Sequence, residues 1–152
     1  MIRKARIGDV KRIYELLNHY ADQKLLLPRS ISSIYDHLRD FFVFDDRYDR
    51  LSGVCGLQIC WEDLAEIRSL AVCENRQGRG IGAALVHCCL QEAELYGISK
   101  IFTLTYQTGF FEKQHFVAID KHELPHKIWR DCVNCSMFPD CDEEALMYRA
   151  PW

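Results

Sequence analysis

The sequence has no marked excess of charge of either sign and no long apolar run. Its 19 Lys and Arg residues and 22 Asp and Glu residues give a formal net charge of −3. The basic residues do not cluster, which argues against a nucleic-acid partner. No apolar run approaches the about 20 residues of a membrane span, and residues 1–17 lack a signal-peptide pattern. We therefore expect a soluble, cytoplasmic protein without a nucleic-acid or membrane partner, and the composition leaves its oligomeric state open, a homo-oligomer included.

The sequence also lacks internal repeats and linker-like stretches. Its 152 residues, of which 49% are hydrophobic and 27% charged, predict one globular domain over residues 1–152. Eight cysteines are many for an intracellular chain. Five of them lie in apolar, periodic segments and are expected to be small core residues, namely Cys55, Cys60, Cys73, Cys88 and Cys89.

Apolar periodicity predicts a mixed α/β sheet in the order β-α-α-β-β-β-α-β-α-β-β. Strands are expected over residues 2–6, 41–44, 54–61, 64–72, 100–105, 116–119 and 145–149. Helices are expected over residues 8–20, from Ser30 to residue 40, from the glycines near residue 80 to residue 96, and over residues 109–113. The buried positions expected of the second and third helices are Ile31, Ile34, Tyr35 and Leu38, and Leu85, Val86, Cys89 and Ala93.

The stretch ENRQGRGIGAAL, residues 74–85, places Gly78, Gly80 and Gly82 at the start of a helix. Glycine weakens a helix interior by about 1 kcal/mol, so these positions need either a positive φ or close approach of the backbone to an anion. The unpaired amides and the dipole of a helix start favour an anion. No Lys-Ser/Thr pair follows Gly82, which excludes a nucleoside-triphosphatase loop. The spacing and the place after the fourth strand exclude the dinucleotide fingerprint.

Three features together carry a family resemblance. They are the spacing Gln77-x-x-Gly80-x-Gly82 after the strand AEIRSLAV, the segment FFEKQHF at residues 110–116, and the order of strands. They resemble the acetyl-CoA site of the GNAT superfamily of N-acetyltransferases. The resemblance implies acetyl-CoA as co-substrate, with loop amides on its pyrophosphate and its pantetheine arm along the fourth strand. The implied contacts are Leu70, Ala71, Val72, Gln77, Gly78, Arg79, Gly80, Ile81, Gly82 and Ala83.

A narrower resemblance concerns the acceptor. The segments LLLPRSISSIYDHLRDFFV, EIRSLAV, LTYQTGFFEKQHF and IDKHELPHK look like the acetyltransferase domain of N-acetylglutamate synthase, the enzyme that begins arginine biosynthesis. This resemblance implies a short, stand-alone enzyme that acetylates the α-amine of L-glutamate. Two alternatives stay open: an acetyltransferase for another amino acid, a polyamine or a protein amine, and a non-catalytic sensor of coenzyme A.

Glu66 is the candidate general base. The acceptor amine arrives largely as ammonium, so a carboxylate must take its proton directly or through water. Strand alternation predicts positions 66, 68, 70 and 72 on one face. The alternative is a carboxylate that faces solvent or pairs with Arg68. Phe111 stands where many family members have the tyrosine that protonates the leaving thiolate. The coenzyme would therefore either leave as the thiolate or take a proton from water or from Tyr106.

Three cationic residues are candidates for binding the acceptor carboxylates. Arg29 matches a substrate-binding arginine of the synthases, Arg68 lies beside Glu66 on the strand, and Lys127 follows LPH in a matching segment. The planar fork of arginine suits bidentate recognition of a carboxylate. For each residue the alternative is an ordinary solvated side chain.

The last three cysteines lie in a polar stretch. Cys132, Cys135 and Cys141 follow His122 and His126, and three cysteines with one histidine are able to hold structural zinc. The second half of the set lacks its own close pair, so no metal site is assigned. Free thiols, a redox pair and a disulfide, the last disfavoured in a reducing cytosol, are the alternatives.

Overall fold

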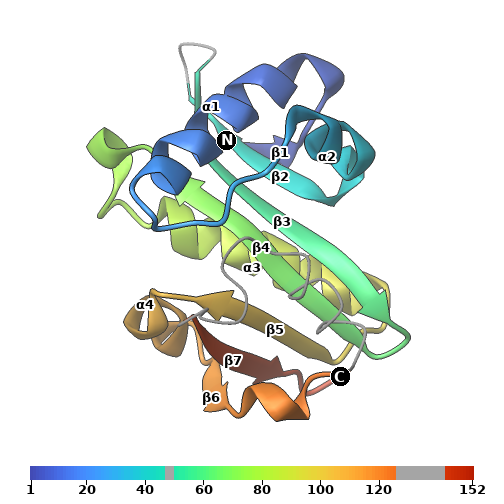
Figure 1. The fold of residues 1–152 in the computed structure, drawn as a ribbon. Helices are drawn as coiled ribbons and strands as arrows, with labels where there is room; N and C mark the ends of the chain where they lie inside the picture. Colours follow the sequence, from blue (N-terminus) through green and yellow to red (C-terminus); the bar gives the residue numbers. More distant parts are fainter. Residues whose placement is uncertain (47–49, 126–142) are drawn as a thin grey trace.

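The computed structural model describes residues 1–46, 50–125 and 143–152 and contains one seven-stranded sheet (Figure 1). Its spatial order is β1-β2-β3-β4-β5-β7-β6. All neighbouring strands are antiparallel except β4 and β5, which are parallel. This mixed sheet confirms the predicted fold class and element order. The strands are β1 (Ile2–Lys4), β2 (Phe41–Asp45), β3 (Leu51–Trp61), β4 (Leu64–Val72), β5 (Lys100–Thr105), β6 (Val117–Ile119) and β7 (Glu144–Arg149).

Helices cover both faces of the sheet. The helix α3 (Ile81–Leu95) packs on one face, whereas α1 (Val10–Asp22) and α2 (Ile31–Asp36) share a core with the other face (Figure 1). In the described ranges no helix is long and apolar enough to cross a membrane. The other helical elements of the described residues are α4 (Thr108–Lys113) and four short 3-10 turns, η1 (Ile7–Asp9), η2 (Leu38–Asp40), η3 (Glu74–Arg76) and η4 (Lys121–Glu123).

The predicted buried faces are confirmed for α3 but only in part for α2. All four predicted inward residues of α3 are buried. The Ser30 Oγ atom caps α2 by accepting from the Ser33 amide at 3.0 Å. The helix then ends at Asp36 instead of continuing to residue 40, so Ile34 is buried whereas Ile31 and Tyr35 are 39% and 45% exposed. The prediction for Ile31 and Tyr35 is wrong because a helix of under two turns presents little more than one side chain to the core.

The sheet opens between its two parallel strands. Pairing of β4 with β5 covers only residues 64–66 and 100–102, and Figure 1 shows the strands diverging beyond it. At the start of the gap, the buried Thr103 Oγ1 atom on β5 donates to the Ile67 carbonyl on β4 at 3.0 Å. Beyond this bridge the edge of β4 that faces β5 has no strand partner in the described chain.

A bulge interrupts β4 at the same level. The register pairs Val54 of β3 with Ala71 and Gly56 with Arg68, so two residues of β4 lie opposite one residue of β3. Ser69, the first of the two, has φ of +57°, a left-handed conformation that is unusual for a residue with a Cβ atom. Such an extra residue bends a strand and reverses the alternation of its side chains.

The bulge overturns the prediction that positions 66, 68, 70 and 72 share one face. Leu70 and Val72 pack with the core under α3. Ala71 instead belongs to the core under α1. Glu66 and Arg68 precede the bulge and therefore share the α1 side of the sheet with Ala71.

Three of the five cysteines predicted to be core residues are confirmed. Cys55, Cys60 and Cys89 are buried, and Cys73 and Cys88 are half-buried; all five are free thiols. The Cys55 and Cys89 sulfur atoms lie 3.6 Å apart between β3 and α3.

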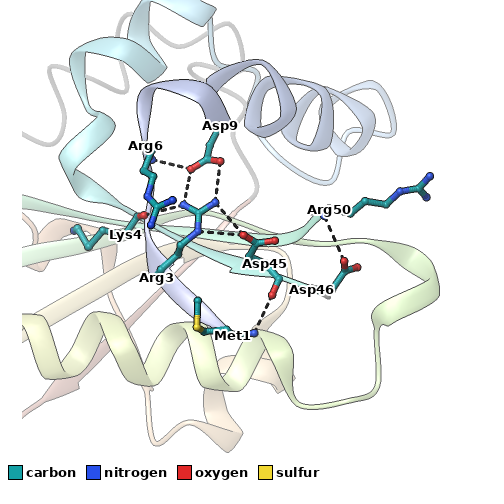
Figure 2. A network of polar contacts seen from close by, with 8 residues as sticks. All are labelled: Met1, Arg3, Lys4, Arg6, Asp9, Asp45, Asp46 and Arg50. Carbon is teal, nitrogen blue, oxygen red and sulfur yellow. Dashed lines mark hydrogen bonds and ion pairs between the residues drawn. The ribbon is translucent and has the colours of Figure 1, made fainter. Parts of the chain in front are cut away.

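The N-terminal edge is held by an ion-pair network that joins β1, η1 and β2 (Figure 2). The Arg3 guanidinium donates to both carboxylate oxygens of Asp9, at 2.7 and 3.0 Å. It also donates to the Asp45 Oδ2 atom at 3.1 and 3.2 Å. The hydrogen bond from Arg3 holds the pKa of Asp9 below its ordinary value. We call Arg3, Asp9 and Asp45 the Arg3 network.

Candidate active site

A cavity of about 900 Å³ lies where β4 and β5 diverge. It is lined by the ends of α1 and β4, by the turn before α3, and by parts of β5 and α4. Arg79 is exposed and does not line it, and Lys127 lies outside the described residues. The predicted site residues that line the cavity are Arg29, Glu66, Arg68, Leu70, Ala71, Val72, Gln77, Gly78, Gly80, Ile81, Gly82 and Ala83.

The three glycines before and within α3 serve two different physical needs. Gly78 and Gly80 have φ of +77° and +79°, and a Cβ atom at either position would have no atom within 4 Å. Their surroundings are therefore open. Gly82 allows close packing instead, because its Cβ atom would lie 3.3 Å from the Phe110 ring. The first helical bond runs from the Ala84 amide to the Gly80 carbonyl at 3.0 Å, so the preceding amides are free of the helix ladder.

Tyr20 and Gln77 brace this turn from the side. The buried Tyr20 hydroxyl donates to the Val72 carbonyl at the end of β4. The Gln77 side-chain amide donates to the Tyr20 oxygen at 2.8 Å and to the Val72 carbonyl at 3.1 Å. Burial raises the pKa of Tyr20, which keeps the hydroxyl protonated as a donor. The Gln77 side chain therefore holds the turn to β4 instead of pointing freely into the cavity.

Glu66 is a buried carboxylate on the cavity wall, with 9% of its surface exposed. Its Oε1 atom lies 3.7 Å from the Arg68 Nε atom. The Arg68 guanidinium is itself held by the Gln58 side-chain oxygen at 2.6 Å. The suggested pairing of Glu66 with Arg68 is therefore present, and it is a loose contact inside the cavity instead of a surface ion pair.

Arg29 is the cavity cation with the least electrostatic compensation. Within residues 1–46, 50–125 and 143–152 its guanidinium donates to two hydroxyls, Ser33 Oγ at 3.2 Å and Ser69 Oγ at 3.3 Å, and it stacks 5.1 Å from the Phe41 ring centre. Among the described residues no carboxylate lies within 4 Å of it. Burial, and secondarily the charge of Arg68, lower the pKa of Arg29 to about 10. Binding of an anion would therefore stabilise this desolvated guanidinium.

Several cavity residues were missed from the sequence. Residues 25–28 and Tyr20 line the cavity, and none of them is predicted as a site residue from the sequence. Glu143, a second buried carboxylate on the cavity wall, directly precedes β7. The sequence signal that could have indicated it is the pair Glu143-Glu144 directly before the apolar residues of the strand. Ser69 carries no local signal for its left-handed backbone. The other missed residues are Ile67, Arg76, Thr103, Leu104, Thr105 and Gln107.

Phe110 and Phe111 form an aromatic wall. Phe111 is buried, with its ring 5.0 Å from Phe110 and 5.2 Å from Phe116 in edge-to-face contacts. Both Phe110 and Phe111 line the cavity, and Tyr106 does not. The aromatic wall therefore offers no acidic proton to a leaving group.

Metal ligands do not gather in the part of the chain that the structure describes: no three His, Cys, Asp or Glu side chains there form a candidate metal site. His122 is exposed, and its Nδ1 atom lies 2.8 Å from Asp120. Cys132, Cys135, Cys141 and His126 lie outside the described residues.

Comparison with known families decides the class of this site. A model described as the acetyltransferase (GNAT) family matches residues 10–116. The chain belongs to the GNAT family. It is an acetyl-CoA-dependent N-acetyltransferase, and acetyl-CoA is its co-substrate.

Individual relatives share this class. The chain is 39% identical over 146 residues to an uncharacterized N-acetyltransferase of Chlorobaculum tepidum, covering 96% of this chain and 94% of that protein. It is 36% identical over 122 residues to an amino-acid acetyltransferase of Mycobacterium tuberculosis, covering 79% and 70%. Its fold is similar to N-acetylglutamate synthase of Neisseria gonorrhoeae complexed with coenzyme A and N-acetyl-glutamate, with a TM-score of 0.89 and 27% identity over all of this chain. This chain spans only 35% of that structure.

Proposed function

We propose that the protein transfers the acetyl group of acetyl-CoA to the α-amine of L-glutamate. The observation that carries the proposal is Arg29, a desolvated cation on the cavity wall whose hydrogen bonds go to hydroxyls and not to carboxylates. Arg68 lies near enough to lower the pKa of Arg29. Two guanidinium groups on one wall suit an acceptor with more than one carboxylate. Lys127 is proposed as a further contact.

The turn before α3 is proposed to hold the coenzyme diphosphate. Gly78 and Gly80 leave open space at the helix start, where free amides and the helix dipole favour phosphate oxygens. In the described chain the edge of β4 that faces β5 has no strand partner at residues 70–72, although the Val72 carbonyl already accepts from Tyr20 and Gln77. The remaining backbone groups of this edge would bind the pantetheine arm as an added strand. Arg79, whose side chain does not line the cavity, would take part through its backbone.

Glu66 is proposed as the general base. Its carboxylate is buried on the cavity wall, where it accepts the ammonium proton directly or through one water so that the neutral amine attacks the thioester carbonyl. Backbone amides next to the bulge, at Leu70, would stabilise the negative charge that develops on the carbonyl oxygen. The bulge turns the Leu70 side chain to the face of the sheet opposite Glu66, so only the backbone of Leu70 is proposed to act on the substrate.

The leaving thiolate has no phenol available on the aromatic wall. Phe111 is buried among rings, and Tyr106 does not line the cavity. We therefore propose that the thiolate leaves as such or takes a proton from water. The names of the relatives support an amino acid as acceptor, because one is called an amino-acid acetyltransferase and one was solved with N-acetyl-glutamate.

An amine panel tests the proposal. Release of coenzyme A thiol is measured with acetyl-CoA and, in turn, L-glutamate, L-glutamine, L-aspartate, L-arginine, spermidine and a peptide with a free N-terminus. We expect the largest kcat/KM for L-glutamate and a product acetylated at the α-amine. Turnover of another amine with only background release for L-glutamate would refute the acceptor while leaving the enzyme class intact.

A further inference from the structure

We infer that Tyr20 is a positioning residue that couples the coenzyme half of the cavity to its acceptor half. The acceptor half is defined by residues 25–29, which line the cavity and which we call the acceptor segment. That name rests on the proposed function. The coenzyme half is defined by residues 77–83, which we call the coenzyme loop.

The side chain of Tyr20 belongs to the coenzyme half. Its hydroxyl donates to the Val72 carbonyl, where β4 ends, and accepts from the Gln77 amide, where the coenzyme loop begins. One buried phenol oxygen therefore joins the two sides of the turn that leads into α3. On the exposed side of this turn, His19 and Gln23 both contact the Glu74 carboxylate, at 3.1 and 3.5 Å.

The backbone of Tyr20 belongs to the acceptor half. Its carbonyl accepts from the Gln23 amide at 3.1 Å and from the Leu25 amide at 3.0 Å. Between them Lys24 has φ of +60°, so the chain reverses sharply and enters the acceptor segment. The position of residues 25–29 therefore depends on the same residue that braces the coenzyme loop.

A rigid residue with both sets of contacts links the two binding events. Bound coenzyme that orders residues 77–83 would fix the position of the Gln77 side-chain amide and, through it, the Tyr20 hydroxyl. A fixed Tyr20 would in turn hold the start of the acceptor segment in place. Binding free energies are reciprocal, so an acceptor held by residues 25–29 would strengthen coenzyme binding by the same factor. The link would favour acceptor capture by the enzyme that already carries acetyl-CoA.

Hydrogen exchange with coenzyme A alone tests this coupling in the wild type and in Tyr20→Phe. In the wild type we expect coenzyme A to slow exchange both in the coenzyme loop and at residues 25–27, the latter by about 3- to 10-fold. In Tyr20→Phe the loop should still be protected whereas residues 25–27 should not. Unchanged exchange at residues 25–27 in the wild type, or equal protection in the variant, would overturn the inference.

Tyr14→Phe is the matched control. Tyr14 lies on the same helix, packs against the same core, and its hydroxyl makes no hydrogen bond within the described ranges. This variant should behave as the wild type. Loss of protection in both variants would show that the effect comes from α1 as a whole and would also overturn the inference.

Steady-state kinetics give a second readout that a purely structural role would not change. With the best amine of the panel, Tyr20→Phe should raise KM for both substrates by about 2- to 10-fold, the value of one neutral hydrogen bond, with kcat within about twofold. A changed melting temperature with both KM values unchanged would contradict the coupling. The exchange experiment needs no acceptor, so failure of L-glutamate as substrate would not be mistaken for failure of this inference.

Discussion

The Arg3 network and the Arg29 site hold the same functional group in opposite electrostatic surroundings. Arg3 donates to two carboxylates, those of Asp9 and Asp45 (Figure 2). Arg29 donates to hydroxyls, and its pKa falls to about 10. A guanidinium that is fully paired within the chain stabilises the fold. One that is desolvated without a carboxylate partner lowers stability unless a ligand supplies the anion, and for this reason we propose Arg29 as the arginine that binds the acceptor.

The largest expected effect falls on turnover in the cavity. Glu66→Gln keeps the shape of the side chain but removes its basicity, so kcat should fall by about 10²- to 10⁴-fold. The value of kcat is measured from release of coenzyme A thiol over pH 6–9, and circular dichroism shows that the variant is folded. The matched variant in the Arg3 network, Asp9→Asn, should leave kcat within about twofold. A Glu66→Gln enzyme with near wild-type kcat would remove the general base from the account.

Arg29→Met should lower kcat/KM for L-glutamate by about 30- to 5,000-fold, since loss of one partner of a desolvated ion pair costs about 2–5 kcal/mol. The effect should appear mainly in KM for the acceptor and not in KM for acetyl-CoA. Arg29→Lys keeps the charge without the planar fork and should recover only part of the loss. An unchanged acceptor KM in both variants would contradict the role of Arg29.

Arg3→Met should lower the stability of the fold and leave acceptor binding unchanged, the opposite of Arg29→Met. It leaves two partly buried carboxylates without their shared cation, so the free energy of unfolding should fall by about 2–3 kcal/mol. Below its melting temperature the enzyme should keep its acceptor KM. Urea unfolding and kinetics on one preparation measure both quantities. A raised KM for the acceptor with an unchanged free energy of unfolding would contradict the contrast between Arg3 and Arg29.

The same urea experiment on Arg29→Met should show a gain of about 1 kcal/mol after allowance for solvent screening. The folded protein disfavours the charged form of Arg29 relative to the unfolded chain, so the penalty is fully present below pH 10 and shrinks at higher pH. The substitution relieves it at pH 7. Destabilisation of the unliganded protein by more than 1 kcal/mol would mean that Arg29 is structurally paired.

The smallest expected effect is an acid-dependent loss of stability from Asp9. Its folded pKa lies below the ordinary value because Arg3 donates to it. The stabilisation is therefore present above the unfolded pKa of about 4 and is lost as the pH falls through the folded pKa. Unfolding curves between pH 5 and 2 should show a steeper decline for the wild type than for Asp9→Asn. Parallel declines would place the acid sensitivity elsewhere.

Much of the fold could be predicted because its signals are local and repeated. The buried face of α3, the cap at Ser30 and the glycines at 78 and 80 each follow from one short-range rule. Gly82 shows the limit of such rules, since its need comes from the Phe110 ring, 28 residues away in sequence.

The parts of the site that could not be predicted depend on contacts made after folding. The bulge at Ser69 breaks the alternation on which the placement of residues 70 and 72 relied, and serine carries no signal for a positive φ. Tyr20 satisfies the pattern of a core residue, which conceals the hydrogen bonds of its hydroxyl. That no carboxylate among the described residues lies within 4 Å of the Arg29 guanidinium follows only from the folded structure, although the residue itself could be selected from the resemblance.

The decisive experiment for the role of Arg29 is a crystal structure with coenzyme A and N-acetyl-L-glutamate. We predict that a carboxylate of the product lies within hydrogen-bond distance of the Arg29 guanidinium, with the diphosphate on the amides around Gly78 and Gly80. A product whose carboxylates contact other cations, with Arg29 still bonded only to Ser33 and Ser69, would contradict it.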